Sequence, residues 1–332
     1  MTHNDKSLSP RTDLAIEARE MVQEQEKSQG RLDGIEVKEE KDADYMLTHV
    51  RITTKEGSRI MGKPMGNYIT IEAGKLKENH VECHEKLIGI LAKELGCLAR
   101  MERHDTVLVA GLGNWNITPD ALGPKVVSKI LVTRHLKDAL PHRIMESVRP
   151  VAAVSPGVMG ITGMETREIV KGIVEKLHPK LLIAVDALAA RKTSRINTTI
   201  QLSDTGLAPG AGVGNERKML NEETLGIPVI AIGVPTVVDA ATLVNDTMDC
   251  MLAEMKAQTD RNTPFYDMLR SMEHEEKYGL ITELLHPYMD NMFVTPKEVD
   301  AVVDRLAGII ANAVNIALHP GITLSDINRY QS

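Results

Sequence analysis

The sequence predicts an α/β fold: a mainly parallel, twisted sheet flanked by helices, with an N-terminal arm and a helical insertion. From about residue 106 onward, short and almost wholly apolar runs alternate with amphipathic helical patterns. This alternation is typical of parallel strands whose two faces are covered by helices. A hydrophobic content of 42% supports a large core, and with only two Phe and one Trp that core must be mainly aliphatic.

The N-terminal part predicts an arm, a two-stranded ribbon and a helix. Residues 1–43 are dense in charge and poor in large apolar side chains, which favours an extended arm with one short helix near Leu14–Gln25. The runs "YMLTHVRITT" and "NYITIEA" are rich in β-branched residues and predict antiparallel strands. Between Lys77 and Arg100, apolar residues recur at helical spacing and predict an amphipathic helix.

The strand–helix alternation begins after this helix. "TVLVAGLG", "PVAAVSPG" and "PVIAIGVP" are predicted strands, followed by predicted helices over 121–137, 165–177 and 239–257. "KLLIAVDAL" and "INTTIQLSD" are two further predicted strands joined by a polar loop. Residues 258–295 lack this alternation and predict a helical insertion. The last helix is expected to begin at Thr295 as its N-cap, with proline at the first helical position.

Composition narrows the class of protein. Proteins that bind nucleic acid in general carry a basic face, and a net charge of -7 argues against one. We therefore do not expect direct binding of nucleic acid. Three cysteines without a C-x-x-C pair fit a reducing compartment. The N-terminus has no apolar signal region, and no run is expected to reach the roughly 20 apolar residues of a membrane span. We therefore expect a soluble, cytoplasmic protein that does not bind membranes.

The stretch "VLVAGLGNWNITPDALGPK" joins a predicted strand to a predicted helix through a glycine-rich turn. Gly-x-Gly at the end of a strand often cradles phosphates, but the dinucleotide fingerprint needs a third glycine where Asn116 stands. No Lys-Ser or Lys-Thr follows to complete a P-loop. The turn presents a carboxylate, Asp120, instead. Capping of the next helix is an equally simple interpretation of that residue.

A second carboxylate, Asp186, closes the apolar run "LLIAVD". A charge after five apolar residues must be paired, hydrogen-bonded or functional, because burying it alone costs several kcal/mol. A salt bridge to Arg191 or Arg195 is the structural alternative. Ligands of open parallel sheets bind beyond the carboxyl ends of the strands, so two carboxylates there favour a catalytic pair. One would activate water and the other would protonate or polarise the carbonyl; their individual roles stay open, because a coupled pair titrates jointly.

Three polar, glycine-rich loops accompany these carboxylates: "SPGVMGITGMET", "DALAARKTSRINTTIQ" and "SDTGLAPGAGVGNERK". Glycines let a substrate approach the backbone, although a mobile surface loop has the same composition. No G-x-S-x-G elbow surrounds the serine of the first loop, so no serine nucleophile is expected. The candidate substrate-binding residues from these loops and the glycine-rich turn are Asn114, Thr118, Ser155, Arg191, Lys192, Gly212 and Asn215.

The segment "HVECH" is the candidate metal site. His80 and His84 are one turn apart on a predicted helix, beside Cys83 and Glu82. The zinc motif H-E-x-x-H requires glutamate where Val81 stands, and no third ligand follows. An exposed polar helix face is the better interpretation, and we expect neither a metal nor another cofactor.

Several of these motifs together resemble the germination protease family of spore-forming bacteria. They are "GLGNWNITPDALGP", "SPGVMGITGMET", "LLIAVDALAARKTSRINTTIQLSDTGLAPGAGVGNER" and "PVIAIGVPTVVDAATL", and the resemblance extends over nearly the whole chain. It implies a fold similar to that of hydrogenase-maturation endopeptidases, and an atypical aspartic-type endopeptidase. The family's essential aspartates fall on Asp120 and Asp186. The resemblance also implies a homotetramer in the forespore or spore core, whose substrates are the small acid-soluble proteins that protect spore DNA.

The same resemblance implies a self-processing zymogen. The family's substrates are cut after Glu within sites like Thr-Glu-(Ile/Phe)-Ala-Ser-Glu, and "TDLAIE", residues 12–17, has a similar order. The cut is expected between Asp13 and Leu14. This gives a propeptide over 1–13, a charged arm over 14–43 and a single protease domain over 44–332. An ordinary helix start capped by Thr12 or Asp13 is the structural alternative.

Two other functions remain open from the sequence. One is a metal-dependent maturation endopeptidase on the same fold, using Asp120 and a metal. The other is a non-enzymatic α/β protein that binds an anion in the loop Gly210–Gly214.

Overall fold

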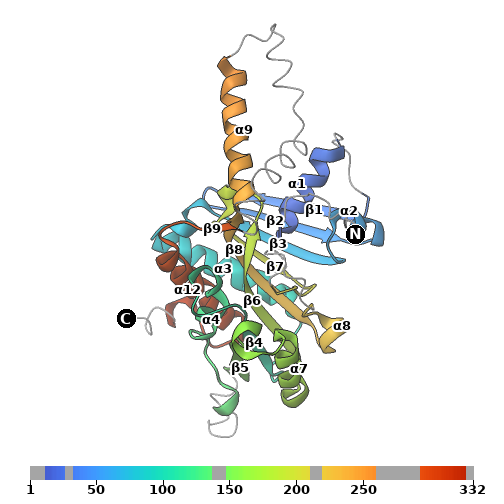
Figure 1. Ribbon diagram of the computed structural model, residues 1–332. Coiled ribbons are helices and arrows are strands. Elements are labelled where there is room, and N and C mark those ends of the chain that lie inside the picture. Colours follow the sequence, from blue (N-terminus) through green and yellow to red (C-terminus); the bar gives the residue numbers. More distant parts are fainter. Residues whose placement is uncertain (1–11, 27–32, 137–146, 210–218, 259–291, 327–332) are drawn as a thin grey trace.

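The computed structural model describes residues 12–26, 33–136, 147–209, 219–258 and 292–326. A nine-stranded sheet runs through the molecule in the order β1-β2-β3-β7-β8-β6-β4-β5, with β9 paired to β8 (Figure 1). The strands are β1 Ile35–Lys41, β2 Met46–Ile52, β3 Gly66–Glu72, β4 Val107–Gly111, β5 Val151–Val154, β6 Leu181–Ala190, β7 Thr199–Ser203, β8 Val229–Asp239 and β9 Phe293–Val294.

The sheet has a parallel half and an antiparallel half. Strands β8, β6, β4 and β5 pair in parallel, as the strand–helix alternation predicts. Strands β1, β2, β3 and β7 pair antiparallel, so the sheet as a whole is mixed. Strand β1 lies in the segment for which an extended arm is predicted. Its sequence IEVKEEK is exposed beyond its first residue, and charge of this kind is what edge strands carry to discourage further pairing.

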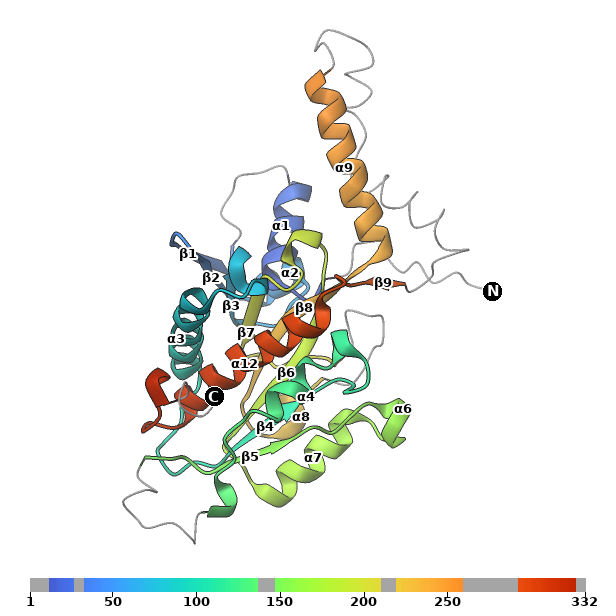
Figure 2. The same cartoon turned by 90° about the vertical axis from the view of Figure 1, so that its left-hand side faces the viewer.

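Helices cover both faces of the sheet (Figures 1 and 2). On one face, α3 and α12 pack with α4 over the largest core of the protein. The opposite face carries two smaller cores, one under α7 and α8 beside the parallel half, and one under α1 and α2 beside the antiparallel half. The helices are α1 Ala15–Glu26, α2 Lys55–Met61, α3 Val81–Leu98, α4 Leu122–Val127, α6 Met159–Thr162, α7 Thr166–Leu177, α8 Glu222–Leu225, α9 Ala240–Gln258 and α12 Val299–Leu318.

Helix α1 confirms the helix expected near residues 14–25, but its surroundings differ from those of an extended arm. Leu14, Ala15 and Glu17 are fully buried, and Ala18 and Val22 pack into the core beside β1, β2 and β3. Small and aliphatic side chains on one side of this charged helix are enough to dock it on the sheet. The average composition of residues 1–43 does not reveal this one-sided apolar stripe, because the charged residues outnumber it.

Other element boundaries also differ from the sequence prediction. Helix α4 has only six residues of the expected 121–137, and a separate 3₁₀ turn follows at Arg134–Leu136. Thr295 does not cap the last helix, because its hydroxyl donates to the carbonyl of Thr236 and the helix begins at Val299 with Glu298 as N-cap. Most of the expected helical insertion, residues 259–291, lies outside the described residues.

Helix α12 corrects the expectation about apolar runs. It is long and apolar enough to cross a membrane by length and composition alone. However, 67% of that window is buried inside the protein, and the helix packs along α3 in the largest core. In the described structure, α12 is therefore a core helix.

Candidate active site

The turn after β4 holds Asp120 by short-range hydrogen bonds. Leu112 N–H donates to Val185 O at 2.8 Å, which joins the end of β4 to β6. The chain then turns back, and the amide of Asn114 donates to Asp120 Oδ2 at 2.8 Å. Gly113 has a φ of +105°, and a Cβ atom there would lie 2.0 Å from the carbonyl oxygen of Asp120. The second glycine of Gly-x-Gly therefore serves the conformation of a turn that carries a carboxylate.

Capping of the following helix does not explain Asp120. Asp120 is the last residue of the 3₁₀ helix Thr118–Asp120, and α4 begins after Ala121, which makes no side-chain capping hydrogen bond. Within the described structure, the side chain of Asp120 bonds back across the glycine-rich turn toward β4.

Asp186 lies in the middle of a strand, which corrects the prediction that the strand ends there. Strand β6 runs from Leu181 to Ala190, because the long strand β8 continues to pair with it beyond Asp186. On its other side, β4 ends level with Val185. Asp186 therefore follows the end of the neighbouring strand, not the end of its own. It is only 5% exposed, and Ala187 N–H donates to its Oδ1 at 3.0 Å.

The register of the sheet places Asp186 in a row with two other residues. It pairs with Gly233 on β8, which in turn pairs with Gln201 on β7. Side chains that pair directly share a face, and adjacent strands lie about 4.8 Å apart, so Gln201 is about 10 Å from Asp186 on the same face. The neighbours Ile183 and Val185 belong to the large core, so this row faces the opposite side. There it lies between the two smaller cores.

Leu188 packs over the middle of this row, and a hydrogen bond brings the turn of Asp120 toward β8. A Cβ atom on Gly233 would lie 2.4 Å from Leu188 Cδ1, so a larger residue there would displace that leucine. Thr236, three residues further along β8, donates its hydroxyl to the carbonyl of Pro119 at 2.7 Å. The residue before Asp120 is thus bonded to the strand that faces Asp186. Both carboxylates border the region where β4 ends beside β6 and β8.

The N-terminal segment lies on this same face. Gln201 Oε1 accepts a hydrogen bond from Ala15 N–H at 2.6 Å, so β7 caps the first turn of α1. The same side chain donates through Nε2 to the carbonyl of Asp13 at 3.2 Å. Lys63 Nζ donates to the carbonyls of Asp13 and Thr12 at 3.0 and 3.3 Å. The bond Asp13–Leu14 is therefore held at the row that contains Asp186.

Asp13 also pairs with the distal part of β6. Its amide donates to Ala189 O at 3.2 Å, and Ala189 N–H donates to its Oδ2 at 2.9 Å. Burial raises the pKa of the Asp13 carboxyl above its ordinary range, against the bond from Ala189 and the charge of Lys63. Burial likewise lowers the pKa of the Lys63 ammonium, against the charge of Asp13. At both groups, burial and the nearby opposite charge therefore act against each other.

Glu17 is enclosed by the polar loop after β6. Its two carboxylate oxygens accept from the amides of Arg191 and Lys192 at 2.7 and 2.9 Å, and the hydroxyl of Thr12 donates to it as well. Arg195 Nη1 lies 3.4 Å from the same carboxylate. Arg195, one of the two arginines considered as partners of Asp186, therefore lies against the N-terminal segment.

Arg195 also joins this segment to the sheet. It forms hydrogen-bonded ion pairs with Glu20 and with Glu72. Burial opposes the charged form of Glu20, but bonds from Arg195 and Lys192 outweigh it and lower the pKa of that carboxyl to about 2. Helix α1, β3 and the loop after β6 are thus tied together by buried charge.

The predicted substrate-binding residues that the structure describes lie on the loops that follow β4, β5 and β6. Asn114 and Thr118 belong to the turn of Asp120, and Ser155 is exposed directly after β5. Arg191 and Lys192 bind Glu17 through their amides. Gly212 and Asn215 lie outside the described residues.

The segment "HVECH" has a local structural role. His80 is the N-cap of α3, where its Nδ1 accepts from the amide of Cys83, so the two histidines do not share a helix face as expected. Among the described residues, no group of three or more His, Cys, Asp or Glu side chains could hold a metal ion.

Sequence patterns did not single out four residues around the site: Lys63, Gln201, Gly233 and Thr236. Gln201 carried a faint signal, since it is a large polar residue in the apolar strand "INTTIQLSD". Lys63, in "MGKPMG", carried none. These residues meet Asp186 and the N-terminal segment only through the register of the sheet.

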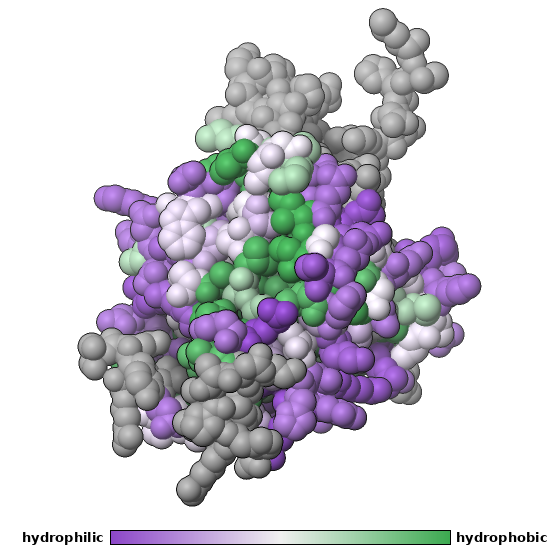
Figure 3. Space-filling model, turned by 90° about the horizontal axis from the view of Figure 1, so that it is seen from below, coloured by the Kyte–Doolittle hydropathy of each residue, from purple (hydrophilic) through white to green (hydrophobic). Residues whose placement is uncertain are grey.

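Exposed apolar side chains border the site on the loops after β4 and β5. Trp115 and Ile117 are 56% and 52% exposed, and Met159, Ile161 and Met164 on the next loop are similarly open. The exposed apolar side chains of these two loops form a rim of the kind that can hold a protein or peptide ligand. In a different view of the molecule, seen from below, apolar side chains gather in the centre of a face surrounded by hydrophilic ones (Figure 3).

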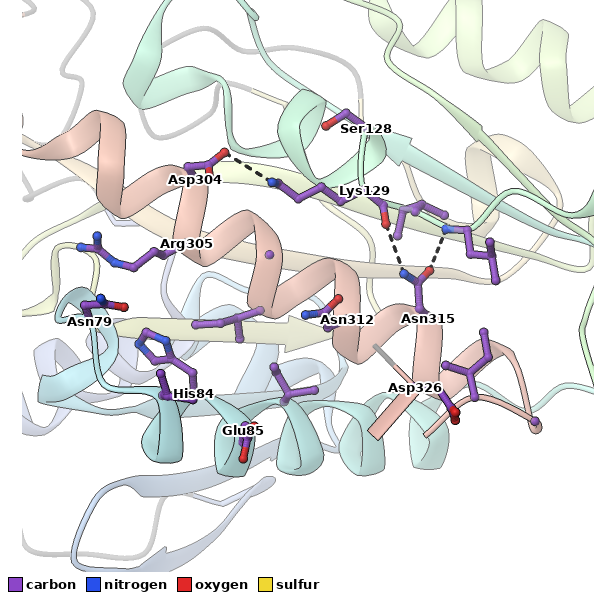
Figure 4. A pocket seen from close by; sticks show the side chains of 18 residues that line it. Asn79, His84, Glu85, Ser128, Lys129, Asp304, Arg305, Asn312, Asn315 and Asp326 are labelled. Atoms are coloured by element: carbon purple, nitrogen blue, oxygen red, sulfur yellow. Dashed lines mark hydrogen bonds and ion pairs between the residues drawn. The ribbon is translucent and has the colours of Figure 1, made fainter. Parts of the chain in front are cut away.

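A separate cavity of about 1160 Å³ lies on the opposite side of the sheet, along α12 between α3 and the segment after α4 (Figure 4). Asn315 closes one end, because it accepts from Leu131 N–H at 2.9 Å and donates to Lys129 O at 3.2 Å. Lys129 also lies 3.5 Å from Asp304. The sheet separates this cavity from the row that contains Asp186.

Comparison with known proteins gives consistent matches. The family model described as germination protease matches residues 15–265 and 253–331. A germination protease of Clostridium tetani is 50% identical over 97% of this chain and 99% of its own length. One from Bacillus cereus (strain B4264) is 44% identical over 97% of each chain. A solved structure of a NiFe hydrogenase maturation protease, HycI from Thermococcus kodakarensis KOD1, is 18% identical with a TM-score of 0.26, covering 43% of this chain and 80% of that one; a match at this level does not establish a shared fold.

Proposed function

This chain belongs to the germination protease family, and on that premise we propose that it is an aspartic-type endopeptidase made as a self-processing zymogen. Its proposed substrates are the small acid-soluble proteins that protect spore DNA, whose degradation it begins during germination. The observation that carries this proposal is the position of Asp186. It is a buried carboxylate within an apolar strand, on the row of the sheet to which the N-terminal segment is bonded, and its strand contacts the turn of Asp120.

Asp120 and Asp186 are the proposed catalytic pair. Two carboxylates near one another cannot both ionise cheaply, so they share a proton and their apparent pKa values separate. The ionised member would take a proton from water while the protonated member polarises the carbonyl of the substrate. The hydrogen bond from Asn114 N–H supports this role, because it orients Asp120 from a turn whose shape Gly113 determines.

The proposed self-cut lies between Asp13 and Leu14. Its support is that the segment Thr12–Glu17 lies on the face of Asp186, with the carbonyl of Asp13 bonded to Gln201 in the same row. A tethered segment has a high effective concentration at its own site. The segment would first occupy the site and then be cut there, and the groups that hold Thr12 and Asp13 would receive protein substrates after residues 1–13 leave. The proposed candidates for substrate contact are Asn114, Thr118, Ser155, Arg191, Lys192, Gly212 and Asn215.

We also propose a homotetramer in the forespore or spore core. Light scattering on the purified full-length chain would measure its mass in solution, and a monomer at micromolar concentration would contradict that assembly.

The substrate proposal is tested by incubating the converted protein with a purified small acid-soluble spore protein and, in parallel, with unfolded casein. We expect the spore protein to be cut at one or two sites on the carboxyl side of an acidic residue, identified by mass spectrometry. Casein should be cut at least about 100-fold more slowly, because discrimination between substrates is set by differential binding in the transition state. Equal cleavage of both proteins would contradict the proposed substrate class.

A further inference from the structure

The predicted cut has an unusual set of hydrogen-bond donors around it. The two carbonyls on its N-terminal side, those of Thr12 and Asp13, both accept from Lys63 Nζ. The Asp13 carbonyl, which belongs to the bond Asp13–Leu14, accepts from Gln201 Nε2 as well. This oxygen is therefore held by two side-chain donors, one of them a cation.

Lys63 reaches this position from a well-defined turn. Helix α2 ends at Gly62 in the left-handed conformation, and Ser58 bonds to Lys63 twice, through its carbonyl and its hydroxyl. The next carbonyl, that of Pro64, accepts from the hydroxyl of Tyr68 at 2.8 Å. The backbone of Lys63 is thus bonded on both sides, while its ammonium lies on the face of the sheet that carries the N-terminal segment. A lysine buried in this way needs an acidic or carbonyl partner to remain charged.

The side chain of Asp13 is held by other groups of the same region. Ala189 N–H donates to its carboxylate, and Ala189 O accepts from its amide. The partners of Asp13, namely Lys63, Gln201 and Ala189, belong to α2–β3, β7 and β6. None of them belongs to residues 1–13, so the partners stay in place when that segment leaves.

We propose that Lys63, Gln201 and the backbone of Ala189 form the subsite for the acidic residue whose carbonyl is attacked, with Lys63 as its specificity-determining residue. Asp13 occupies this subsite in the full-length chain, and an aspartate or glutamate of a protein substrate occupies it after conversion. The inference rests on the proposed cut at Asp13–Leu14 and assigns residues to it.

The chemistry of the step explains why these donors matter. The oxygen of water bonds to the carbonyl carbon of Asp13, the carbon–nitrogen bond to Leu14 breaks, and the leaving nitrogen takes a proton. Negative charge develops on the Asp13 carbonyl oxygen before the bond breaks. Lys63 and Gln201 already donate to that oxygen, and preorganised donors at such a position stabilise the transition state. The ammonium of Lys63 also favours an acidic side chain at the same residue, because opposite charges attract most strongly away from water.

The first experiment measures self-conversion of the full-length chain by mass spectrometry. Removal of one donor to such an oxygen typically costs about 100-fold or more. We therefore expect Lys63→Met to slow conversion about 100-fold, and Lys63→Arg, which keeps the charge, to slow it by about tenfold. The matched control is Lys75→Met, since Lys75 is an exposed lysine that pairs with Asp44 away from the site; it should convert at the wild-type rate.

The second experiment measures specificity in trans, with converted protein and peptides of residues 8–20 that carry Asp, Glu or Asn at position 13. The wild-type protein should prefer the acidic peptides by about 100-fold in kcat/KM, and Lys63→Met should reduce that preference to about threefold or less. A merely structural role for Lys63 would lower all three rates equally and leave the preference unchanged. That result would overturn the assignment.

Two further outcomes separate this inference from the proposed function. Wild-type conversion and preference in Lys63→Met, together with no conversion in Asp186→Asn, would overturn the subsite and leave the catalytic pair standing. Normal conversion in Asp186→Asn would overturn the catalytic pair itself. If Lys63→Met does not fold, as judged by thermal unfolding, Lys63→Arg and Gln201→Leu decide the matter: wild-type rates and preference in both would overturn the proposal.

Discussion

Two regions of the sheet hold carboxylates in different ways. Beside the antiparallel half, Glu17 is fully buried and is bonded to the loop after β6 and close to Arg195, residues about 175 positions away in the sequence. In the parallel half, Asp120 and Asp186 accept hydrogen bonds from the amides of Asn114 and Ala187, which are near them in sequence. The first arrangement ties distant segments together. The second orients a carboxylate locally.

The difference predicts whether substitution of each carboxylate should lower the stability of the fold or the rate of catalysis. Breaking a bond between distant segments releases helix α1 from the sheet, so the free energy of unfolding should fall. Changing a carboxylate held by its own turn or strand leaves the bonds between distant segments in place. The protein should therefore still fold, and the catalytic rate should fall. Five variants, one pH profile and one chelation experiment test this contrast, and they are arranged from the largest expected effect to the smallest.

The largest effect is expected from Asp120→Asn and Asp186→Asn. Each amide keeps the shape of the side chain but cannot exchange the proton, so kcat should fall by about 10³- to 10⁴-fold while KM changes little. Steady-state kinetics on a spore-protein substrate measures this. Asp304→Asn, on the exposed side of α12, is the matched control and should keep wild-type kinetics. Wild-type turnover in either site variant would remove it from the catalytic pair.

Arg195→Met tests the other side of the comparison. It leaves Glu17 and Glu20 buried without this cation, and breaking a buried ion pair costs about 3–5 kcal/mol. Urea unfolding of an Asp186→Asn background, which should not convert, measures the loss without interference from cleavage. Arg59→Met removes an exposed pair with Glu56 and should leave the unfolding midpoint unchanged. A stable Arg195→Met variant would show that the ties to α1 contribute little.

Gly113→Ala tests whether the turn of Asp120 is locally determined. The added methyl group would meet the Asp120 carbonyl, and the positive φ of +105° is costly for alanine, so about 1–3 kcal/mol of stability should be lost. Activity should fall by about tenfold or more, because Asp120 is displaced. Gly160→Ala, at a glycine with no atom within 4 Å of the added Cβ, is the control. Unchanged activity would mean that the orientation of Asp120 does not depend on this turn.

The docking of Asp13 should depend modestly on pH. Its pKa is raised above the ordinary 3.8 in the docked state, so that state binds the proton more tightly than the undocked one. Docking is therefore favoured as pH falls, and the advantage is lost as pH rises through the raised value. Conversion of the full-length chain should accelerate several-fold on mild acidification, measured by mass spectrometry. Asp13→Asn removes the titrating group, so it should flatten that profile at the lower rate expected for a residue without an acidic side chain; an unchanged slope would place the pH response elsewhere, for instance in the catalytic pair.

Chelation should have the smallest effect. The described residues offer no cluster of three metal ligands, and His80 is occupied as a helix cap. Dialysis against EDTA should therefore leave the rate on a spore-protein substrate within error of the untreated protein. Loss of activity that zinc or nickel restores would revive the metal-dependent alternative.

Much of the parallel half could be predicted from local sequence, and much of the antiparallel half could not. Strands such as β4, β6 and β8 are buried on both faces, so their apolar runs stand out at once. Strand β1 is an exposed edge strand whose backbone pairing with β2 leaves little trace in its charged side chains. Composition likewise placed residues 12–26 in an extended arm with one short helix. In the structure that helix is docked on the sheet through Ala15, Ala18 and Val22.

The sequence by itself determined the α/β class, the glycine-rich turn with Asp120, the apolar strand with Asp186, and the family. These signals are local, because they depend on side-chain periodicity, on glycine at a special backbone angle and on motifs of contiguous residues. Only the tertiary structure decided that Asp186 lies within β6, and that Gly233, Gln201 and the bond Asp13–Leu14 share its face. Those relations depend on strand order and register, which the backbone pairing of distant segments establishes. No single segment of the sequence contains that information.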